Sequence, residues 1–496
     1  MAEELTPETP EPETPETEEA PTKPRKNGLY PGVSDELAEN MKSGWADTEL
    51  HGLEPIAQAS ETAARRAALS ARFPGERLVI PAGNLKTRSN DTEYAFRAST
   101  EYTYLTGDQT QDGVLVLEPK TGPSGQGGHD ATVYLLPRSN RENGEFWLDG
   151  QGELWVGRRH SLTEAEQLLG IPAKDVRELT AALKDATGPV RNVRGHDAGV
   201  EAALTDKVTA ERDEELRVHL SEARAVKDAF EIGELQKAVD STVRGFEDVV
   251  KILDKAEATS ERYIEGTFFL RARVEGNDIG YGSICAAGPH ATTLHWVRND
   301  GDVRSGDLLL LDAGVETHTL YTADVTRTLP VNGRYSEIQR KIYDAVYDSQ
   351  EAGIAAVRPG AKYRDFHDAS QRVLAERLVE WGLLEGPVEK VLELGLQRRW
   401  TLHGTGHMLG LDVHDCAAAR REAYADGTLE PGMCLTVEPG LYFQADDLTV
   451  PEEYRGIGVR IEDDILVTED GNRNLSAALP RRADEVEAWM AALKQA

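Results

Sequence analysis

Apolar side chains recur along the chain in two patterns. The first, short apolar runs between helical segments, indicates a domain that mixes strands with helices. Short apolar runs that end at proline or polar residues predict buried strands at 78–80, 114–117 and 133–136. Residues 44–71 and 162–169 have the composition and spacing of helices. This alternation predicts an α/β domain over residues 44–208.

The second part of the chain begins with the apolar spacing of a helix. Mostly apolar residues recur at steps of three and four, at Leu235, Val239, Thr242, Phe246, Val249 and Leu253. The charged stretch before them predicts a linker helix over 209–230. Strands and helices then alternate over 231–496, with a long helical region at 336–382 that Pro359-Gly360 interrupts. We expect a larger second domain of the α/β (α+β) class.

The N-terminal 43 residues differ from both domains. Residues 1–27 contain eight Glu and six Pro with almost no apolar side chains. Burial therefore cannot offset the entropy that ordering this segment would cost. We expect an acidic, disordered leader over 1–43, and its Glu/Thr/Pro repetition leaves recruitment of a partner open as an alternative to plain solvation.

Charge and cysteine content narrow the expected partners and location. The 496 residues include 55 Lys and Arg against 87 Asp and Glu, which gives a net charge of −32. So acidic a surface repels phosphate backbones and anionic lipid headgroups, and we expect no nucleic-acid or membrane partner. Three widely spaced cysteines, Cys285, Cys416 and Cys434, predict buried free thiols in a reducing compartment. With no signal-peptide pattern at the N-terminus, we expect a cytoplasmic protein.

The first candidate site residues follow a strongly apolar strand. Four leucines at 308–311 predict a buried strand that ends at Asp312, and Asp324 falls on the expected return strand of a hairpin. Two carboxylates could therefore converge from neighbouring strands. Taken by itself, the segment favours a simpler interpretation, with an ordinary turn after Asp312 and a solvated carboxylate at Asp324.

Histidines gather in the same half of the chain. Three of them, His403, His407 and His414, lie among glycines, which disfavour a regular helix and let the backbone pass close to a site. The pattern is neither a dinucleotide-binding loop nor an H-E-x-x-H zinc motif. Structural histidines and a ligand or acid/base role are equally compatible with it.

Two more carboxylates follow strand-like segments. Glu438 ends an apolar run and is followed by Pro-Gly, a placement typical of an inward-facing carboxylate at a strand end. In 458–464, alternation puts Arg460, Glu462 and Asp464 on one strand face, either as an exposed salt-bridged edge or as part of a site. Four carboxylates with one or two imidazoles would suit a pair of divalent ions such as Mn²⁺ or Co²⁺ better than a thiolate zinc site.

Several segments carry a family resemblance that covers nearly the whole chain. In order and spacing, DAGVETHTLYTADVTRTLPVNGRY, HGTGHMLGLDVHD, LTVEPGLYF and YRGIGVRIEDDILVTEDG resemble the pita-bread metallopeptidases, most closely the aminopeptidase P family. FRASTEYTYLTG and ELWVGRRHS resemble that family's non-catalytic N-terminal domain. The resemblance implies an N-terminal α/β domain followed by a C-terminal pita-bread metallopeptidase domain.

The resemblance also implies a set of metal ligands. They fall on Asp312, Asp324, His407, Glu438 and Glu462, which would hold two divalent ions per subunit, with Mn²⁺ as the expected metal. Asp324 and Glu462 would bridge the ions, while Arg460, and less directly Tyr442, would orient the ligands. Asp312 and Asp324 are twelve residues apart, one more than the family's usual step.

The implied activity is release of the N-terminal residue from peptides with proline in the second position. A hydroxide held between the two metals would attack the Xaa-Pro bond, and Glu438 would move a proton from it to the proline nitrogen. His295, His403 and His414 would hold the substrate and stabilise the oxyanion.

The resemblance leaves alternatives open. A prolidase, which cuts Xaa-Pro dipeptides, uses the same five ligands, although PEEYRGIGVRIEDDI resembles aminopeptidase P more closely. A catalytically inactive binding module on the same fold is the remote alternative, because it would have no reason to keep the ligands. The family resemblance also implies a homodimer or homotetramer.

Overall fold

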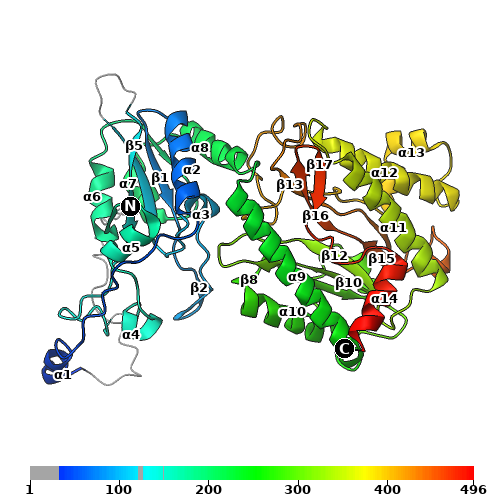
Figure 1. Cartoon of the computed structure of the whole chain (residues 1–496), viewed down its shortest axis with the longest axis horizontal. Coiled ribbons are helices and arrows are strands. Elements are labelled where there is room, and N and C mark those ends of the chain that lie inside the picture. The colour runs from blue at the N-terminus through cyan, green and yellow to red at the C-terminus, as the bar shows by residue number, and fades with distance from the viewer. Residues whose placement is uncertain (1–32, 121–126, 149, 496) are drawn as a thin grey trace, which may run out of the picture.

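The computed structural model describes residues 33–120, 127–148 and 150–495, which form two domains joined by helix α8 (Figure 1). Most of the predicted leader lies outside the described residues, and its disorder stays a prediction there. Its described end differs from that prediction, because α1 (Asp35–Asn40) is a short helix. The hydroxyl of Ser34 caps α1 by accepting a hydrogen bond from the backbone N–H of Leu37.

The first domain is built on a mixed five-stranded sheet in the order β6-β5-β4-β1-β7. The strands are β1 (Arg77–Pro81), β4 (Val114–Pro119), β5 (His129–Leu135), β6 (Ala173–Asp175) and β7 (Val190–Asn192). β1 pairs antiparallel with β4 and parallel with β7. The three apolar runs of the sequence are the three central strands β5, β4 and β1, which explains why they could be predicted.

Helices and a small hairpin complete the first domain. The helices are α2 (Ala59–Arg72), α3 (Thr100–Thr106), α4 (Glu153–Val156), α5 (Leu162–Leu169), α6 (Leu179–Lys184) and α7 (Ala198–Leu204), with the 3-10 helix η1 (Val176–Glu178) and the hairpin β2 (Thr87–Ser89) and β3 (Thr92–Glu93). The prediction of α5 is confirmed, with a capping box at its start. The helix expected from residue 44 is wrong in its first half, because Gly52 at φ 65° and Pro55 interrupt the segment before α2.

Helix α8 (Ala210–Ala223) leads into α9 (Ala229–Ala256), the first helix of the second domain. The predicted linker helix is therefore broken within its range, since α8 ends at Ala223 and a capping box at Asp228 and Glu231 starts α9. The apolar stripe predicted for 235–253 is the buried side of α9.

In the second domain, helices lie around a central group of strands (Figure 1). The further helices are α10 (Glu261–Glu275), α11 (Glu337–Ala356), α12 (Tyr363–Glu380), α13 (Val388–Leu394) and α14 (Ala483–Leu493), with the 3-10 helices η2 (Gly288–Thr292), η3 (Leu396–Arg399) and η4 (Glu452–Tyr454). The break predicted in the region 336–382 is confirmed, with α11 and α12 on either side of Gly360 at φ 81°.

The strands of the second domain form small sheets that meet at one place. They are β8 (Asp278–Ile279), β9 (Ile284–Ala287), β10 (Leu308–Ala313), β11 (Val315–Glu316), β12 (Val325–Pro330), β13 (Cys434–Val437), β14 (Gly440–Phe443), β15 (Ile457–Arg460), β16 (Asp463–Thr468) and β17 (Gly471–Asn474). β12-β10-β9 and β13-β16-β17 each form a three-stranded sheet, and β14 pairs with β15. The single strand expected through 458–464 is divided into β15 and β16, because Glu462 pairs instead with Thr326 across the sheets.

The two domains share a continuous apolar core. Buried residues of α3, such as Tyr102 and Leu105, belong to the same cluster as Leu409 and Leu411 of the second domain. Cys285, Cys416 and Cys434 are buried and free, as predicted. Within the described ranges, no helix combines the length and apolar character that crossing a bilayer requires.

Candidate active site

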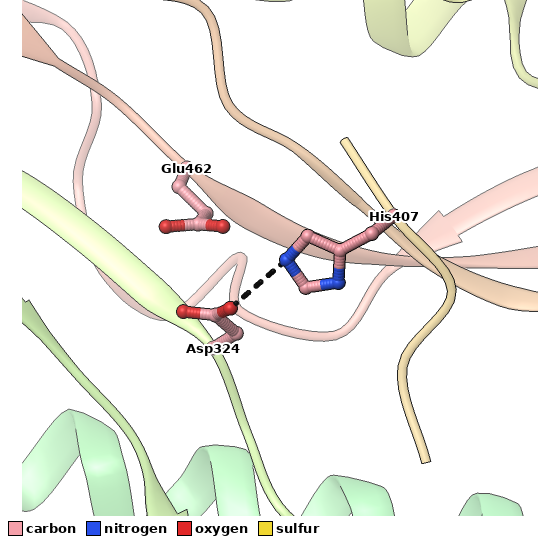
Figure 2. Close-up of side chains that lie close together, drawn as sticks. All are labelled: Asp324, His407 and Glu462. Carbon is pink, nitrogen blue, oxygen red and sulfur yellow. Dashed lines mark ion pairs between the residues drawn. The ribbon is translucent and has the colours of Figure 1, made fainter. Parts of the chain in front are cut away.

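Acidic side chains from several strand ends converge where the small sheets meet. Asp324 lies directly before β12, Glu462 between β15 and β16, and His407 on the segment beside β13, and the three point toward one another (Figure 2). One ligand atom from each lies within 4.8 Å of the others. Nε2 of His407 is 3.2 Å from Oδ2 of Asp324. This trio alone offers a cation two carboxylates and an imidazole.

The other two expected ligands adjoin the trio. Oε1 of Glu438 lies 3.6 Å from Nε2 of His407. Asp312, on β10, is linked to Asp324 through Tyr281, whose hydroxyl lies 2.6 Å from Oδ1 of each carboxylate. The structure therefore brings all five expected ligand residues together.

Two glycines make this convergence possible. A Cβ at Gly314 would lie 1.7 Å from the Ala323 carbonyl oxygen, at the point where the hairpin places Asp312 near Asp324. A Cβ at Gly406 would lie 2.0 Å from the Thr436 carbonyl oxygen, where the His407 segment runs against β13. A side chain at either position would force the backbones apart, so the close approach predicted for the histidine segment has a specific cause.

Neighbouring groups fix the orientation of the ligands. Nη2 of buried Arg460 is 2.5 Å from Oδ2 of Asp312, the contact with a terminal carboxylate that the sequence suggested. Nδ1 of His407 lies 3.1 Å from the Met408 carbonyl oxygen. With Nδ1 directed at that carbonyl, Nε2 of His407 is the ring nitrogen that faces the carboxylates, and it would bind a cation after losing its proton.

Three supporting hydroxyls escaped the sequence reasoning. Thr326 donates to Oε2 of Glu462 at 2.6 Å, and Thr436 donates to Oε1 of Glu438 at 3.4 Å. Thr436 is two residues from Glu438, so strand alternation could have found it. Tyr281 precedes Asp312 by more than thirty residues, and no local pattern connects the two.

The charge of this cluster is unbalanced. The carboxylates of Asp312, Asp324 and Glu462 are buried and that of Glu438 is half-buried, yet one guanidinium, that of Arg460, faces them. Burial and the charges of the neighbouring carboxylates raise the pKa of Glu462 well above its usual range. Burial raises the pKa of Glu438 to about 7, although the charge of His407 opposes this.

Burial has the opposite effect on the pKa of the imidazole, but the net change is again upward. Burial acts to lower the pKa of His407, but its hydrogen bond to Asp324 and the charge of Glu438 raise it to about 9. An oxygen-rich set with one imidazole and excess negative charge therefore fits divalent cations. This conclusion rests on the types of ligand atom and on their net charge rather than on any single distance.

His403 and His414 lie beside the cluster. Nδ1 of His403 is 3.6 Å from Oε2 of Glu438, and its Nε2 is 2.8 Å from the hydroxyl of Tyr442. The ring of His414 makes an edge contact with that of His407, with centroids 4.3 Å apart. Burial, with the charge of Arg460, lowers the pKa of His403 to about 3, and burial also lowers that of His414. Both imidazoles are therefore neutral at pH 7.

His295 is exposed on the segment that follows β9. Leu294 and Trp296 of this segment pack against a small cluster that contains Tyr442. A single buried carboxylate, Glu261 at the start of α10, anchors the segment by accepting four hydrogen bonds at 2.7–2.8 Å, from the Ala287 and Gly301 backbone N–H groups and from the His290 and Trp296 side chains. Sequence reasoning also missed Glu261, because its partners lie 26 to 40 positions further along the chain.

Comparison with known proteins places the chain in a class. Residues 233–469 match the model of metallopeptidase family M24, and residues 62–193 match the aminopeptidase P N-terminal domain. Xaa-Pro aminopeptidase 1 of Streptomyces coelicolor is 86% identical over 100% of both chains.

Solved structures agree with this class. Aminopeptidase P from Escherichia coli with the inhibitor Pro-Leu is 32% identical with a TM-score of 0.78, covering 89% of this chain and 100% of that one. The zinc-substituted form of the same enzyme in complex with product has a TM-score of 0.79 and 32% identity, covering 89% of this chain and 99% of that one. The chain belongs to the Xaa-Pro aminopeptidases of metallopeptidase family M24, and the expected two-domain, pita-bread architecture is confirmed.

Proposed function

We propose that this chain is a metal-dependent aminopeptidase that releases the N-terminal residue from peptides with proline in the second position. The observation that carries this proposal is the convergence of four carboxylates and His407 at the meeting of the small sheets. The names of its relatives, and the inhibitor Pro-Leu in one of their structures, support the specificity for proline.

In this proposal, Asp312, Asp324, His407, Glu438 and Glu462 hold two divalent ions, and Mn²⁺ is the metal we propose. When bound, such ions supply Lewis-acid polarisation of the peptide carbonyl and lower the pKa of a coordinated water. Arg460 keeps Asp312 oriented, and Tyr442 extends this support to His403 through its hydroxyl.

Glu438 is the proposed general base. It lies beside His407 in the carboxylate cluster, where a carboxylate can take a proton from a coordinated water and release it again. Its Oε2 faces His403, 3.6 Å from Nδ1 of that residue.

The histidines around the cluster hold the peptide in this proposal. His403 accepts from Tyr442 at Nε2 and donates from Nδ1 to the Gly404 carbonyl oxygen, so its ring is fixed in one orientation. The exposed imidazoles of His295 and His414 are available to the substrate as hydrogen-bond donors.

Mass spectrometry of reaction products tests the proposal. Protein loaded with Mn²⁺ is incubated with Arg-Pro-Pro, Ala-Pro and Met-Ala-Ser, each with and without chelator. We expect chelator-sensitive release of Arg from the tripeptide, with the other two substrates slow. Rapid cleavage of Ala-Pro alone would instead establish a prolidase, and no cleavage despite bound metal would favour a binding module.

We further propose a cytoplasmic homodimer or homotetramer. Three buried free cysteines support a reducing compartment. Leu154, Trp155 and Val156 of α4 are each 55% exposed, an apolar group that association of subunits would cover. Analytical ultracentrifugation should therefore give two or four chains per particle, and a single chain at micromolar concentration would refute the assembly.

A further inference from the structure

The segment between His407 and His414, here called the 408–413 loop, is closed at its base. The two histidine rings contact each other there, with centroids 4.3 Å apart. The backbone N–H of Asp415 donates to the Met408 carbonyl oxygen at 2.9 Å. The position of His414 over the metal cluster is therefore set by how the rest of this loop is held.

Two side chains of the first domain hold the tip of the loop. Nη2 of Arg97 donates to the Leu411 carbonyl oxygen at 2.5 Å, while Nε of the same guanidinium pairs with Oε2 of Glu316 at 2.9 Å. The hydroxyl of Thr100, the first residue of α3, donates to Oδ1 of Asp412 at 2.7 Å. The two contacts with the loop join residues more than 300 positions apart.

Apolar packing reinforces the polar contacts. Leu409 and Leu411 are buried in the cluster that contains Tyr102 and Tyr104 of α3. The loop thus lies between the carboxylate cluster and α3, and its second half, Leu411 and Asp412, depends on α3 and Arg97 for its position.

We propose that Arg97 and Thr100 are positioning residues for catalysis, which act by holding the 408–413 loop so that His414 is presented to the substrate. The proposal rests on the proposed role of His414. Arg97 suits the task because its planar fork reaches the Leu411 carbonyl and Glu316 at once, whereas the ammonium of a lysine is a single point charge. The first domain would then be part of the active-site architecture.

Steady-state kinetics on Arg-Pro-Pro tests this proposal with R97A, R97K and T100V. Displacing a catalytic group by about 1 Å can cost roughly a hundredfold in rate, so we expect kcat/KM to fall about 10- to 100-fold in R97A and less in T100V. R97K should resemble R97A, because it keeps the charge toward Glu316 but loses the fork. The bound metal content, measured by inductively coupled plasma mass spectrometry, should remain at the wild-type level.

A matched control separates loop positioning from domain contact in general. Gln109 also joins the two domains, by donating to the His318 carbonyl oxygen at 2.7 Å, a hydrogen bond that does not involve the 408–413 loop. We expect Q109A to stay within about twofold of wild type, as for an exposed surface contact. Equal losses in Q109A and R97A would overturn the proposal.

A double-mutant cycle links Arg97 to His414. If Arg97 acts through His414, adding R97A to H414A should lower kcat/KM by less than about threefold, because coupled residues are non-additive. A full R97A loss in the H414A background would overturn the proposal. An H414A enzyme with wild-type kcat/KM would refute the role of His414 instead, and with it this use of Arg97. If R97A folds poorly, the same cycle is measured with T100V, which removes the hydrogen bond to Asp412 instead.

Discussion

Two clusters of buried charge adjoin the 408–413 loop, and they differ in how their charges balance. In the candidate metal centre, four carboxylates face the guanidinium of Arg460. In the second cluster, here called the interdomain ion cluster, three basic side chains face four acidic ones: Arg65, Arg224 and Lys227 with Glu101, Asp228, Glu231 and Asp415.

The pKa of Asp415, which contacts two of the basic side chains, shows this difference, whereas burial keeps the pKa of Glu231 in the same cluster raised. Burial raises the pKa of Asp312 and Glu462, and Arg460 does not compensate. Burial also acts to raise the pKa of Asp415, but the charges of Arg224 and Lys227 outweigh it and lower that pKa. Buried acids alone therefore do not mark a metal site. The informative feature is the shortage of cations around them, which a bound metal ion would relieve without protonation of the acids.

The strongest way to break the comparison is to remove a ligand from the metal centre. We expect H407A to lose at least one metal ion and to lower kcat about a thousandfold, because even outer-shell changes at metal sites cost 10- to 100-fold. Elemental analysis and kinetics on Arg-Pro-Pro measure both. D254A, at an exposed site on α9, is the control, and an active H407A enzyme with full metal content would contradict the assignment.

Removing a cation from the interdomain ion cluster should act on stability instead. Lys227 is fully buried, and its Nζ lies 3.5 Å from Oδ2 of Asp415. Breaking a buried pair by removing one partner typically costs about 3 kcal/mol, which K227M should lose in denaturant unfolding. Metal affinity should stay unchanged in isothermal titration. Unaltered stability would show that Arg224 alone satisfies Asp415.

Glu261, which anchors the His295 segment, offers a test with a smaller expected effect on kcat/KM. E261Q replaces half of the accepting oxygen atoms with an amide that repels the facing donors, so the segment should shift. We expect kcat/KM to fall about tenfold with metal retained, in the same direction as H295A. H295A should leave the unfolding midpoint unchanged, while E261Q lowers it. Wild-type kinetics in H295A would remove the catalytic role of His295.

The smallest expected effect is on the pH dependence of stability without metal. The pKa of Glu438 rises from 4.5 to about 7 in the folded chain. Its contribution to stability is thus fully present below pH 4.5 and is lost as the pH rises through about 7. Asp415 acts in the reverse sense, because its lowered pKa gives stability that is lost as the pH falls.

Thermal unfolding of chelated protein measures this effect. The unfolding midpoint should fall by a few degrees between pH 5 and 8 and fall less in E438Q, whereas added Mn²⁺ should restore it in the wild type. A wild-type midpoint that rises over this range, or an equal slope in E438Q, would be inconsistent with the pKa of Glu438.

Sequence patterns predicted those parts of the fold that depend on local periodicity. The central strands of the first domain and the buried face of α9 are uniform enough in apolar spacing to be predicted. The start of α2 was missed because glycine and proline outweighed a helical composition. The division between β15 and β16 was missed because it depends on Thr326, which is far away in the sequence.

The candidate site shows the same limit. The convergence of the expected ligand residues could be predicted because the family's motifs keep them in order, and the contact of Arg460 with Asp312 because Arg460 shares a strand face with its neighbours. Tyr281, Glu261 and Arg97 could not, since each acts on a partner that only the folded chain brings near. Positions that hold catalytic groups in place leave little local signal, even where their contacts are strong.

Equilibrium dialysis of the wild-type protein against Mn²⁺, with kcat measured on the same samples, tests the central claim most directly. If the unbalanced carboxylate cluster is the metal centre, the chain should bind about two ions, and kcat should rise in step with occupancy. Full activity without bound metal, or two ions retained in D324A, would contradict the account.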